Sequence, residues 1–289
     1  MTQRRPPARA LSTRLPWNDR GGRLSPLKAA TLLGLCLPGL LLAFDLAGRR
    51  LGPMPISAAI HETGLWAIRF LLLSLTITPL RRTMRWPRVM QVRRMVGVAA
   101  FAYVAAHLVL YAVDLKLDLA RVASEIVLRF YLTIGFVALL LLAALAATST
   151  DAMIRRLGGR RWQLLHRAVY GAAVLGVAHH FLQSKLNVTE PTIMAGFLIW
   201  LLGSRLLAAA DDPVRLALLS GAAAAATVLG EAAWFGLATG ADPLRVLAAN
   251  LDISFGLRPG PIVLLSGFAV TAVVLARATL RMVRPAVVR

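Results

Sequence analysis

The segment WQLLHRAVYGAAVLGVAHHFL (162–182) is apolar over the length of a membrane-spanning helix and carries His166, His179 and His180. A helix rises about 1.5 Å per residue, so His166 and His179 lie roughly 20 Å apart along a hydrocarbon core about 30 Å thick. Ionisable side chains at that depth are costly and usually face the bundle interior. Because neutral imidazole is a common ligand of heme iron, the segment predicts an electron-transfer site. Histidines that only join helices by hydrogen bonds are the alternative.

Composition places the whole chain in a membrane. Of its 289 residues 58% are hydrophobic and 16% are charged, and the mean hydropathy is +0.68. These values are typical of a polytopic membrane protein whose surface contacts lipid. The net charge of +20 comes from arginines in short segments between apolar spans, so we interpret it as a topology signal and expect no nucleic acid partner. The single cysteine, Cys36, excludes an intrachain disulfide and a cysteine-ligated cluster.

Apolar runs along the chain predict eight spans. They lie at about 29–47, 56–80, 95–113, 130–148, 162–182, 193–210, 214–238 and 261–279. We therefore predict an all-α fold, a polytopic bundle of membrane helices. We divide it into a basic N-terminal segment (1–28), a six-helix core (29–210) and an additional pair of transmembrane helices (211–289). Glycine and alanine in that pair suit close helix packing, and Glu231 is its one acid with a buried setting.

Basic segments predict the orientation. RRTMRWPRVMQVRR (81–94) contains six arginines and no acid, so the positive-inside rule makes this loop cytoplasmic, and an even number of spans leaves both termini inside. A second basic segment, TSTDAMIRRLGGRRW (148–162), also belongs inside. Within it Thr150 or Ser149 is expected to cap a short interfacial helix that stops at Gly158 and Gly159.

The five histidines, at 61, 107, 166, 179 and 180, all fall within or beside predicted spans. His107 lies roughly 18 Å above the inner start of its span and His179 roughly 24 Å above the start of its own. These heights are comparable, so the two are expected to ligate one heme from opposite sides. His61, at the outer start of the second span, is expected to act as a propionate partner, a quinone contact, a third ligand or a solvated interface residue.

His166 has no matching histidine on the third span, where Arg93 and Arg94 stand at the same depth. An inner heme there has one protein imidazole or a different partner. Guanidinium groups at that level suit heme propionates or a flavin phosphate, because they bind such oxyanions bidentately. The chain has no GxGxxG after a strand, no P-loop, no nucleophile elbow and no HExxH, so electrons must come from a diffusible donor or a partner protein.

His179 and His180 compete for the outer ligand position. In a straight helix, at about 100° per residue, His180 lies within roughly 40° of the face of His166 and His179 about 140° away. Geometry alone therefore favours His180. A bend or a π-bulge in the helix would remove that argument.

Several stretches resemble one family. They are HETGLWAIRFLLLSLTITPLRR (61–82), RRMVGVAAFAYVAAHLVLY (93–111), FYLTIGF (130–136), ATSTDAMIRRLG (147–158) and RWQLLHRAVYGAAVLGVAHHFLQSK (161–185). Together they resemble the heme-binding membrane subunit of the bacterial periplasmic protein-methionine-sulfoxide reductase system, within the ferric-reductase-like transmembrane group that includes the NADPH oxidases. The resemblance covers about residues 55–205.

The resemblance implies a b-type heme protein of the bacterial inner membrane, with flavin mononucleotide (FMN) as a second cofactor. Such a subunit passes electrons from quinol, or from a cytosolic flavin reductase, to a periplasmic molybdopterin-containing reductase, which itself repairs oxidised methionine. By position the heme histidines fall on His107, His166 and His179, with His180 standing where the family usually has an aromatic residue. The alternatives are a ferric or cupric reductase of the same fold and a transporter or structural subunit without heme.

Overall fold

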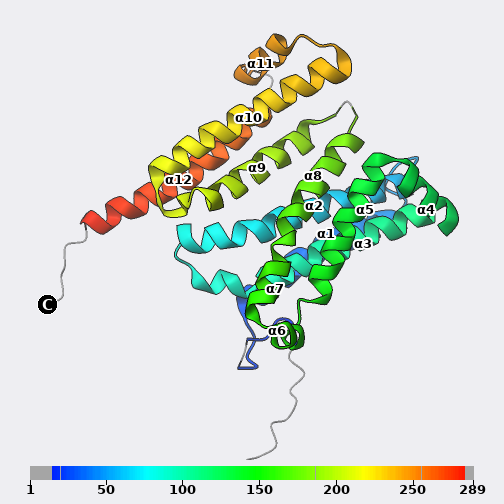
Figure 1. Ribbon diagram of the computed structural model, residues 1–289, viewed down its shortest axis with the longest axis horizontal. Helices are drawn as coiled ribbons and strands as arrows, with labels where there is room; N and C mark the ends of the chain where they lie inside the picture. The colour runs from blue at the N-terminus through cyan, green and yellow to red at the C-terminus, as the bar shows by residue number, and fades with distance from the viewer. Residues whose placement is uncertain (1–14, 20, 186, 255, 284–289) are drawn as a thin grey trace, which may run out of the picture.

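The computed structural model describes residues 15–19, 21–185, 187–254 and 256–283, and it is built of helices (Figure 1). The α-helices are α1 Pro26–Ala47, α2 Pro55–Thr83, α3 Arg93–Asp114, α4 Leu119–Leu128, α5 Phe130–Ala147, α6 Asp151–Leu157, α7 Gly159–His166, α8 Ala168–Gln183, α9 Thr189–Leu206, α10 Pro213–Thr239, α11 Pro243–Leu251 and α12 Pro259–Val283, and the short 3-10 helices are η1 Pro87–Gln91 and η2 Ala209–Asp211. Within the described ranges extended pairing is limited to one isolated bridge, Asn18 with Leu24. The prediction of an all-α fold is confirmed.

Six of the described helices are long and apolar enough to cross a membrane: α1, α2, α3, α5, α10 and α12. The chain is therefore a multi-pass membrane protein. The fifth and sixth predicted spans differ from this set, because α8 has only 16 residues and α9 carries Glu190 and Arg205 within its 18 residues. The prediction of eight spans stays a prediction at these two helices.

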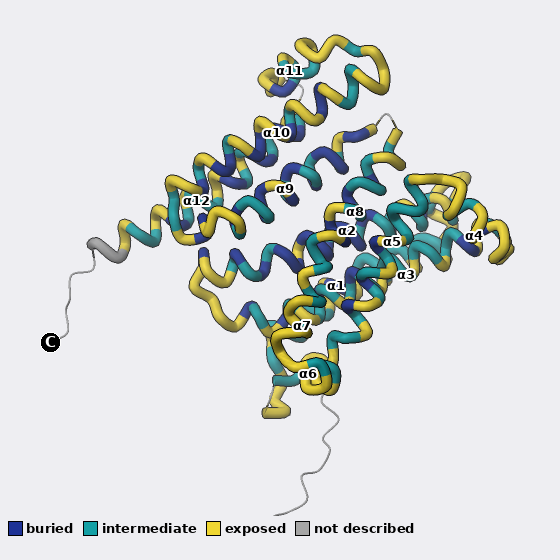
Figure 2. Tube along the Cα trace, in the orientation of Figure 1, coloured by how far each residue is buried: buried dark blue, intermediate teal, exposed yellow. Residues whose placement is uncertain are grey.

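Helix α2 lies at the centre of the bundle and packs against α1, α3, α8 and α9, while α5 packs against α3 and α8. Helix α9 in turn contacts α10 and α12, which form a second layer with it (Figure 1). The buried residues are concentrated along α2, α9 and α10 (Figure 2). The predicted core and the additional helix pair thus share a packed interface. We call the two ends of the bundle the α4 end and the α6 end, after the short helices found there.

Local sequence sets the starts of the C-terminal helices. Helix α10 begins with Pro213 after Asp212, whose carboxylate accepts hydrogen bonds from the backbone N–H groups of Val214 and Arg215 at 3.0 and 3.1 Å. An aspartate cap followed by proline at the first helical position satisfies free N–H groups and presets the backbone angle. Helix α10 ends at Gly240, which has a φ of 70° that glycine adopts without strain.

Helix α1 is held by one tyrosine of α3. The Tyr103 hydroxyl donates to the carbonyl of Leu35 at 2.9 Å and accepts from the N–H of Gly39 at 2.7 Å, so it stands between two groups that a regular helix would join. Pro38, next to this point, cannot donate a backbone hydrogen bond. The Tyr103 hydroxyl therefore satisfies the two backbone groups that lack their helical partner, and it links α1 to α3.

The C-terminal helices approach one another closely, as their glycine and alanine content predicts. A Cβ atom placed on Gly267 of α12 would lie 2.2 Å from the Ser220 hydroxyl oxygen of α10, and one on Gly196 of α9 would lie 2.3 Å from that of Thr227. Larger residues at these glycines would push the helices apart.

Glu231 is buried, as predicted, with a relative exposure of 1%. Its carboxylate accepts from the side-chain amide of Asn250 at 2.7 Å and from the guanidinium of Arg258 at 2.8 Å. Because these groups come from α10, α11 and the segment before α12, the cluster ties α11 to the helix pair. A second charge within a span, Arg69 of α2, is paired with Glu190 of α9 at 2.9 Å.

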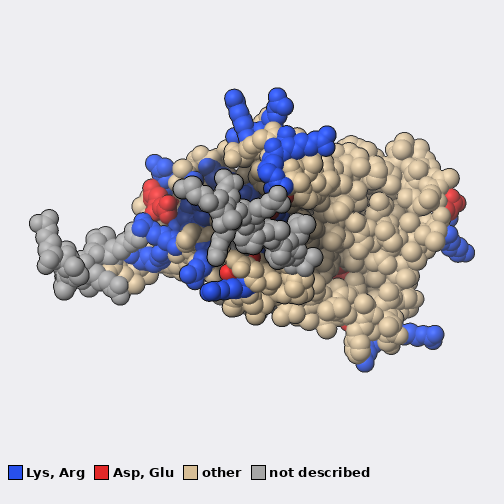
Figure 3. Space-filling view, turned by 90° about the horizontal axis from the view of Figure 1, so that it is seen from below, with Lys and Arg blue, Asp and Glu red and all other residues tan. Residues whose placement is uncertain are grey.

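Basic side chains are unevenly distributed. Figure 3 shows lysines and arginines gathered over part of the face seen from below and few toward its right side. The arginines of α6 and α7, at 155, 156, 160 and 161, are all exposed. An uneven distribution of this kind is typical of multi-pass membrane proteins.

Candidate functional site

Four of the five histidines line one cavity at the α4 end. His61 comes from α2, His107 from α3, and His179 and His180 from α8, while α5 completes the wall. Most of the other lining residues are apolar. The fifth histidine, His166, ends α7 near the α6 end. The structure thus brings together residues that are more than 100 positions apart in the sequence.

The ring of His107 is anchored to the backbone of α2. Its Nδ1 lies 2.8 Å from the carbonyl oxygen of Ile60. Gly64, one helical turn further on, faces the ring, and a Cβ atom there would come within 2.9 Å of the same Nδ1. The glycine therefore makes room for an imidazole that would not fit against any larger residue.

His179 is held in the same way by α5. Its Nδ1 lies 2.8 Å from the carbonyl oxygen of Tyr131. A Cβ atom on Gly135 would lie 2.7 Å from this Nδ1. In both cases the accepting carbonyl belongs to the residue four positions before the glycine, so the two helix pairs present the same anchoring arrangement.

These contacts assign the protons of both rings. A carbonyl oxygen only accepts hydrogen bonds, so Nδ1 of His107 and of His179 must be the donor, and this assignment leaves each Nε2 with its lone pair. Histidines that bind metals usually donate their second ring N–H to a carbonyl or carboxylate, which fixes the tautomer and the ring orientation. In this arrangement Nε2 is the nitrogen of each ring that could bind a metal.

The spacing of the pair suits one metal ion between the rings. The ring centres of His107 and His179 are 6.3 Å apart and the ring planes are inclined by 85°. A metal to imidazole bond is about 2 Å long and the ring centre lies about 1.1 Å behind its nitrogen, so two imidazoles on opposite sides of a metal have centres about 6.2 Å apart. The residues fit a heme iron with two axial histidines.

His180 faces a different partner from its neighbour. Its ring centre lies 6.2 Å from that of His61, with the planes inclined by 47°. His180 is buried, with 8% of its surface exposed, whereas His61 is exposed. Successive residues on a helix point about 100° apart, so α8 presents His179 to α3 and His180 to α2.

The straight-helix argument that favoured His180 over His179 is wrong. The predicted span 162–182 is broken into α7 and α8, with Arg167 between them. The N–H of Arg167 bonds to Leu164 instead of continuing the regular α-helical pattern. Because the helix phase is not carried across this break, the angle between His166 and His180 cannot be obtained from residue spacing.

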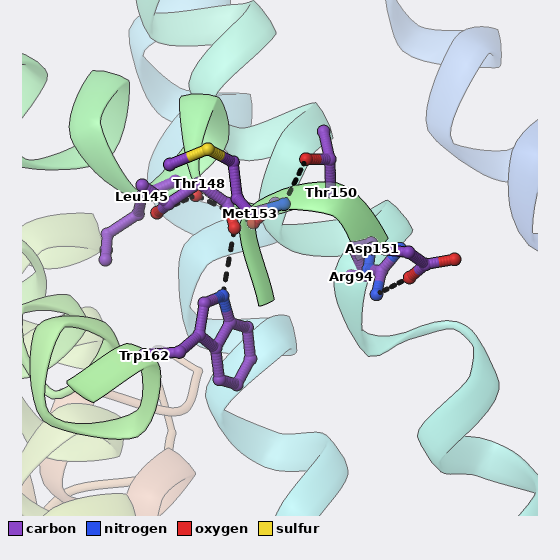
Figure 4. Close-up of polar contacts among 8 residues, drawn as sticks. Arg94, Leu145, Thr148, Thr150, Asp151, Met153 and Trp162 are labelled. Atoms are coloured by element: carbon purple, nitrogen blue, oxygen red, sulfur yellow. Dashed lines mark hydrogen bonds and ion pairs between the residues drawn. The ribbon is translucent and has the colours of Figure 1, made fainter. Parts of the chain in front are cut away.

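The ring of His166 contacts two side chains. Its ring stacks on Trp162 with centres 3.9 Å apart, and its Nε2 lies 3.3 Å from the Thr148 hydroxyl. The indole N–H of Trp162 donates to the Thr148 carbonyl at 2.9 Å, which ties α7 to the end of α5 (Figure 4). This histidine does not line the cavity of the other four.

Arg93 and Arg94 lie at the start of α3, close enough to His166 for their charges to act on it. Arg94 forms an ion pair of 2.7 Å with Asp151, the first residue of α6 (Figure 4). The charge of Arg94 is therefore already compensated in part, which weakens its candidacy as a flavin phosphate ligand.

Thr150 caps α6, as expected for one of the two candidates. Its hydroxyl accepts from the N–H of Met153 at 3.2 Å (Figure 4). The helix ends at Gly158, which has a φ of 77°. Ser149 instead bonds back to the carbonyl of Leu145.

Sequence reasoning missed the two glycines that face the anchored histidines. Gly64 stands within HETGLW and Gly135 within FYLTIGF. A glycine inside an apolar span is the available signal, because it costs helix stability and marks a close approach. That signal does not reveal what approaches.

Comparisons with known proteins agree with this architecture. The family described as ferric reductase like transmembrane component matches residues 63–177. The protein-methionine-sulfoxide reductase heme-binding subunit MsrQ of Rhodospirillum rubrum is 45% identical over 192 residues, which are 66% of this chain and 90% of that protein. The MsrQ proteins of Azospira oryzae and Ralstonia nicotianae are 43% and 40% identical, over 64% and 63% of this chain and 80% and 85% of their own lengths. No solved structure matches the chain.

The helical bundle with histidines facing one another across a cavity, together with the matched segment, defines a ferric-reductase-like transmembrane protein. Within that class the similar proteins identify one family. The chain belongs to the family of protein-methionine-sulfoxide reductase heme-binding subunits, MsrQ.

Proposed function

We propose that this chain is the heme b-containing membrane subunit of a methionine sulfoxide reductase system and transfers electrons across the membrane. The observation that carries the proposal is the pair His107 and His179, with ring centres 6.3 Å apart and each Nδ1 bonded to a backbone carbonyl. The names of the relatives support heme and the methionine sulfoxide reductase system.

In this proposal His107 and His179 hold the heme iron through Nε2. The carbonyls of Ile60 and Tyr131 keep both rings in the required orientation. Heme, when bound by these two histidines, would supply a one-electron carrier. The chain itself performs no reaction on methionine sulfoxide.

We propose quinol as the electron donor, with a cytosolic flavin reductase as the alternative, and a periplasmic molybdopterin-containing methionine sulfoxide reductase as the acceptor. The bacterial inner membrane is the expected location, with both termini cytoplasmic. The basic segments around α6 and α7 support this orientation. Residues 29–210 are proposed as the heme-binding core and 211–289 as an additional unit.

His166 is proposed as a single protein ligand of a second heme near the inner face. Its Nε2 contact with Thr148 at 3.3 Å is longer than a strong hydrogen bond, so a metal can compete for this nitrogen. FMN remains a prediction from the resemblance, with Arg93 and the neighbourhood of α6 as its candidate site by charge.

An optical and EPR spectrum of the purified chain tests the function. We expect a Soret band and the EPR signal of low-spin heme with two imidazole ligands. Quinol should reduce it, and methionine sulfoxide should reoxidise it only when the periplasmic reductase is added. A folded chain without heme absorbance would contradict the proposal and favour a transporter or structural subunit.

The second candidate is a ferric or cupric reductase, which the matched family favours. It differs in the acceptor, because an Fe(III) or Cu(II) chelate alone would then reoxidise the reduced heme. The gene neighbourhood separates the two at little cost. A molybdopterin reductase gene beside this one favours the first, and a metal-uptake cluster favours the second.

A further inference from the structure

His180 carries a nitrogen that nothing in the described structure satisfies. Its side chain is 8% exposed, and its Nε2 has no hydrogen-bond partner in the described part of the chain. The residue lines the cavity at the α4 end. Leaving a buried polar atom unpaired is unfavourable, so such an atom needs an explanation, and coordination of a metal ion would supply one.

His61 stands across from it. The two ring centres are 6.2 Å apart, and His61 is exposed while lining the same cavity. The pair therefore has one histidine in the interior and one at the surface. An ion from outside the bundle can reach the pair on the side of His61. Ser57 and Gln183, which also line the cavity, carry oxygen atoms on the same two helices.

One positive charge near the pair, that of Arg69, is partly compensated by an acidic partner. Arg69 is close enough for its charge to act on His180, but it is paired with Glu190 at 2.9 Å and lies over the Trp66 ring. The repulsion of a cation by Arg69 is therefore reduced.

The ring separation distinguishes between metals. With a metal about 2 Å from one nitrogen of each ring, a tetrahedral angle brings the ring centres to about 5 Å apart, whereas opposite positions give about 6.2 Å. If one metal ion joined the two rings at their present separation of 6.2 Å, the angle at the metal would therefore be wide. Zinc prefers tetrahedral sites, and Cu(II) prefers tetragonal sites with nitrogen ligands in opposite positions and has the highest affinity of the divalent series.

We propose that His61 and His180 bind a Cu(II) ion in opposite coordination positions, beside the heme ligands and separate from them. Water and the oxygens of Ser57 or Gln183 complete the coordination. The proposed Cu(II) site is independent of which electron acceptor the heme serves.

The test uses the full heme-loaded chain in detergent, titrated with Cu(II) and followed by EPR and calorimetry. We expect one ion per chain, with hyperfine coupling to two imidazole nitrogens. His180→Phe and His61→Gln should each weaken Cu(II) binding by at least about ten-fold, since each removes one of two protein ligands. The low-spin heme signal should stay unchanged. Leu182→Phe, which adds an aromatic ring two residues further on at an exposed position, is the control and should bind Cu(II) like the parent.

Two results would overturn the proposal. If His180→Phe binds Cu(II) with the parent affinity and coupling, the ion is adventitious. If His180→Phe loses the low-spin heme signal, His180 is itself an axial ligand and has no nitrogen to give to copper. Zn(II) that displaces Cu(II) at equal concentration would contradict the geometric argument for copper.

Discussion

The two ends of the bundle hold their histidines by different means. At the α4 end His107 and His179 are each anchored by a backbone carbonyl and faced by a glycine. At the α6 end His166 rests on the side chains of Trp162 and Thr148. Backbone anchors direct Nε2 of both rings into the shared cavity, whereas at the α6 end Nε2 is the nitrogen that is engaged. We infer that the α4 end is organised before heme binds and that the α6 end must rearrange.

Removing one imidazole from each end should give the largest contrast. His107→Ala is expected to abolish the low-spin signal with two imidazole ligands, because one axial ligand is lost. His166→Ala should retain that signal and lose at most the second heme. The heme-to-protein ratio and the EPR spectrum of the purified variants measure both effects. Equal loss of the signal in the two variants would show that the ends are not independent.

The glycines test whether preorganisation matters. Gly135→Ala and Gly64→Ala place a methyl group at 2.7 and 2.9 Å from the Nδ1 of the histidine each faces. Overpacking of this kind typically costs about 1–3 kcal/mol, and here it also displaces the ring. We expect a lower unfolding temperature and weaker heme retention in both variants.

Gly97→Ala on α3 is the matched control for the two glycines. A Cβ atom at Gly97 has no neighbour within 4 Å among the described residues. Alanine in a helix interior is favoured over glycine by roughly 0.5–1 kcal/mol, so this variant should be as stable as the parent or more so. If all three variants behave alike, the close contact with the imidazoles has no role.

Trp162→Phe should affect the α6 end alone. It removes the hydrogen bond of 2.9 Å from the indole N–H to the Thr148 carbonyl but retains an aromatic ring beside His166. A hydrogen bond of this type contributes about 0.5–1.5 kcal/mol. Thermal unfolding in detergent should therefore detect a small loss of stability, with the low-spin signal of the α4 end unchanged. A change in that signal would mean that the two ends are coupled.

The lengths of the apolar segments and the rise per residue of a helix were sufficient to predict most of the helices and the proximity of His107 and His179. The heights of His107 and His179 in their spans correctly placed them at one level, because rise per residue is the same in every helix. Burial of Glu231 followed from an isolated acid in an apolar span. These predictions needed only distances along a helix axis.

Rotation about the axis was not predictable. The helix is interrupted at Arg167, between His166 and the two later histidines, so residue spacing could not fix their relative directions. The pairing of His180 with His61 depends on how α2 and α8 pack, which no local pattern encodes. Gly64 and Gly135 were visible in the sequence, but the ring that fills each space comes from another helix.

The smallest expected effect concerns how the α6 end is built. Thr150→Ala removes the hydroxyl that accepts from Met153 N–H at 3.2 Å, and loss of such a cap costs about 1 kcal/mol. Ser149→Ala is the matched control, since the Ser149 hydroxyl bonds back to Leu145 and caps nothing. Because Asp151, the ion-pair partner of Arg94, is the first residue of the capped helix, fraying of α6 should also loosen that pair. Hydrogen exchange of α6 amides should therefore rise in Thr150→Ala and not in Ser149→Ala, while amides of α5 and α8 at the α4 end keep their protection. Protection lost at both ends would instead indicate that the capped helix supports the whole bundle.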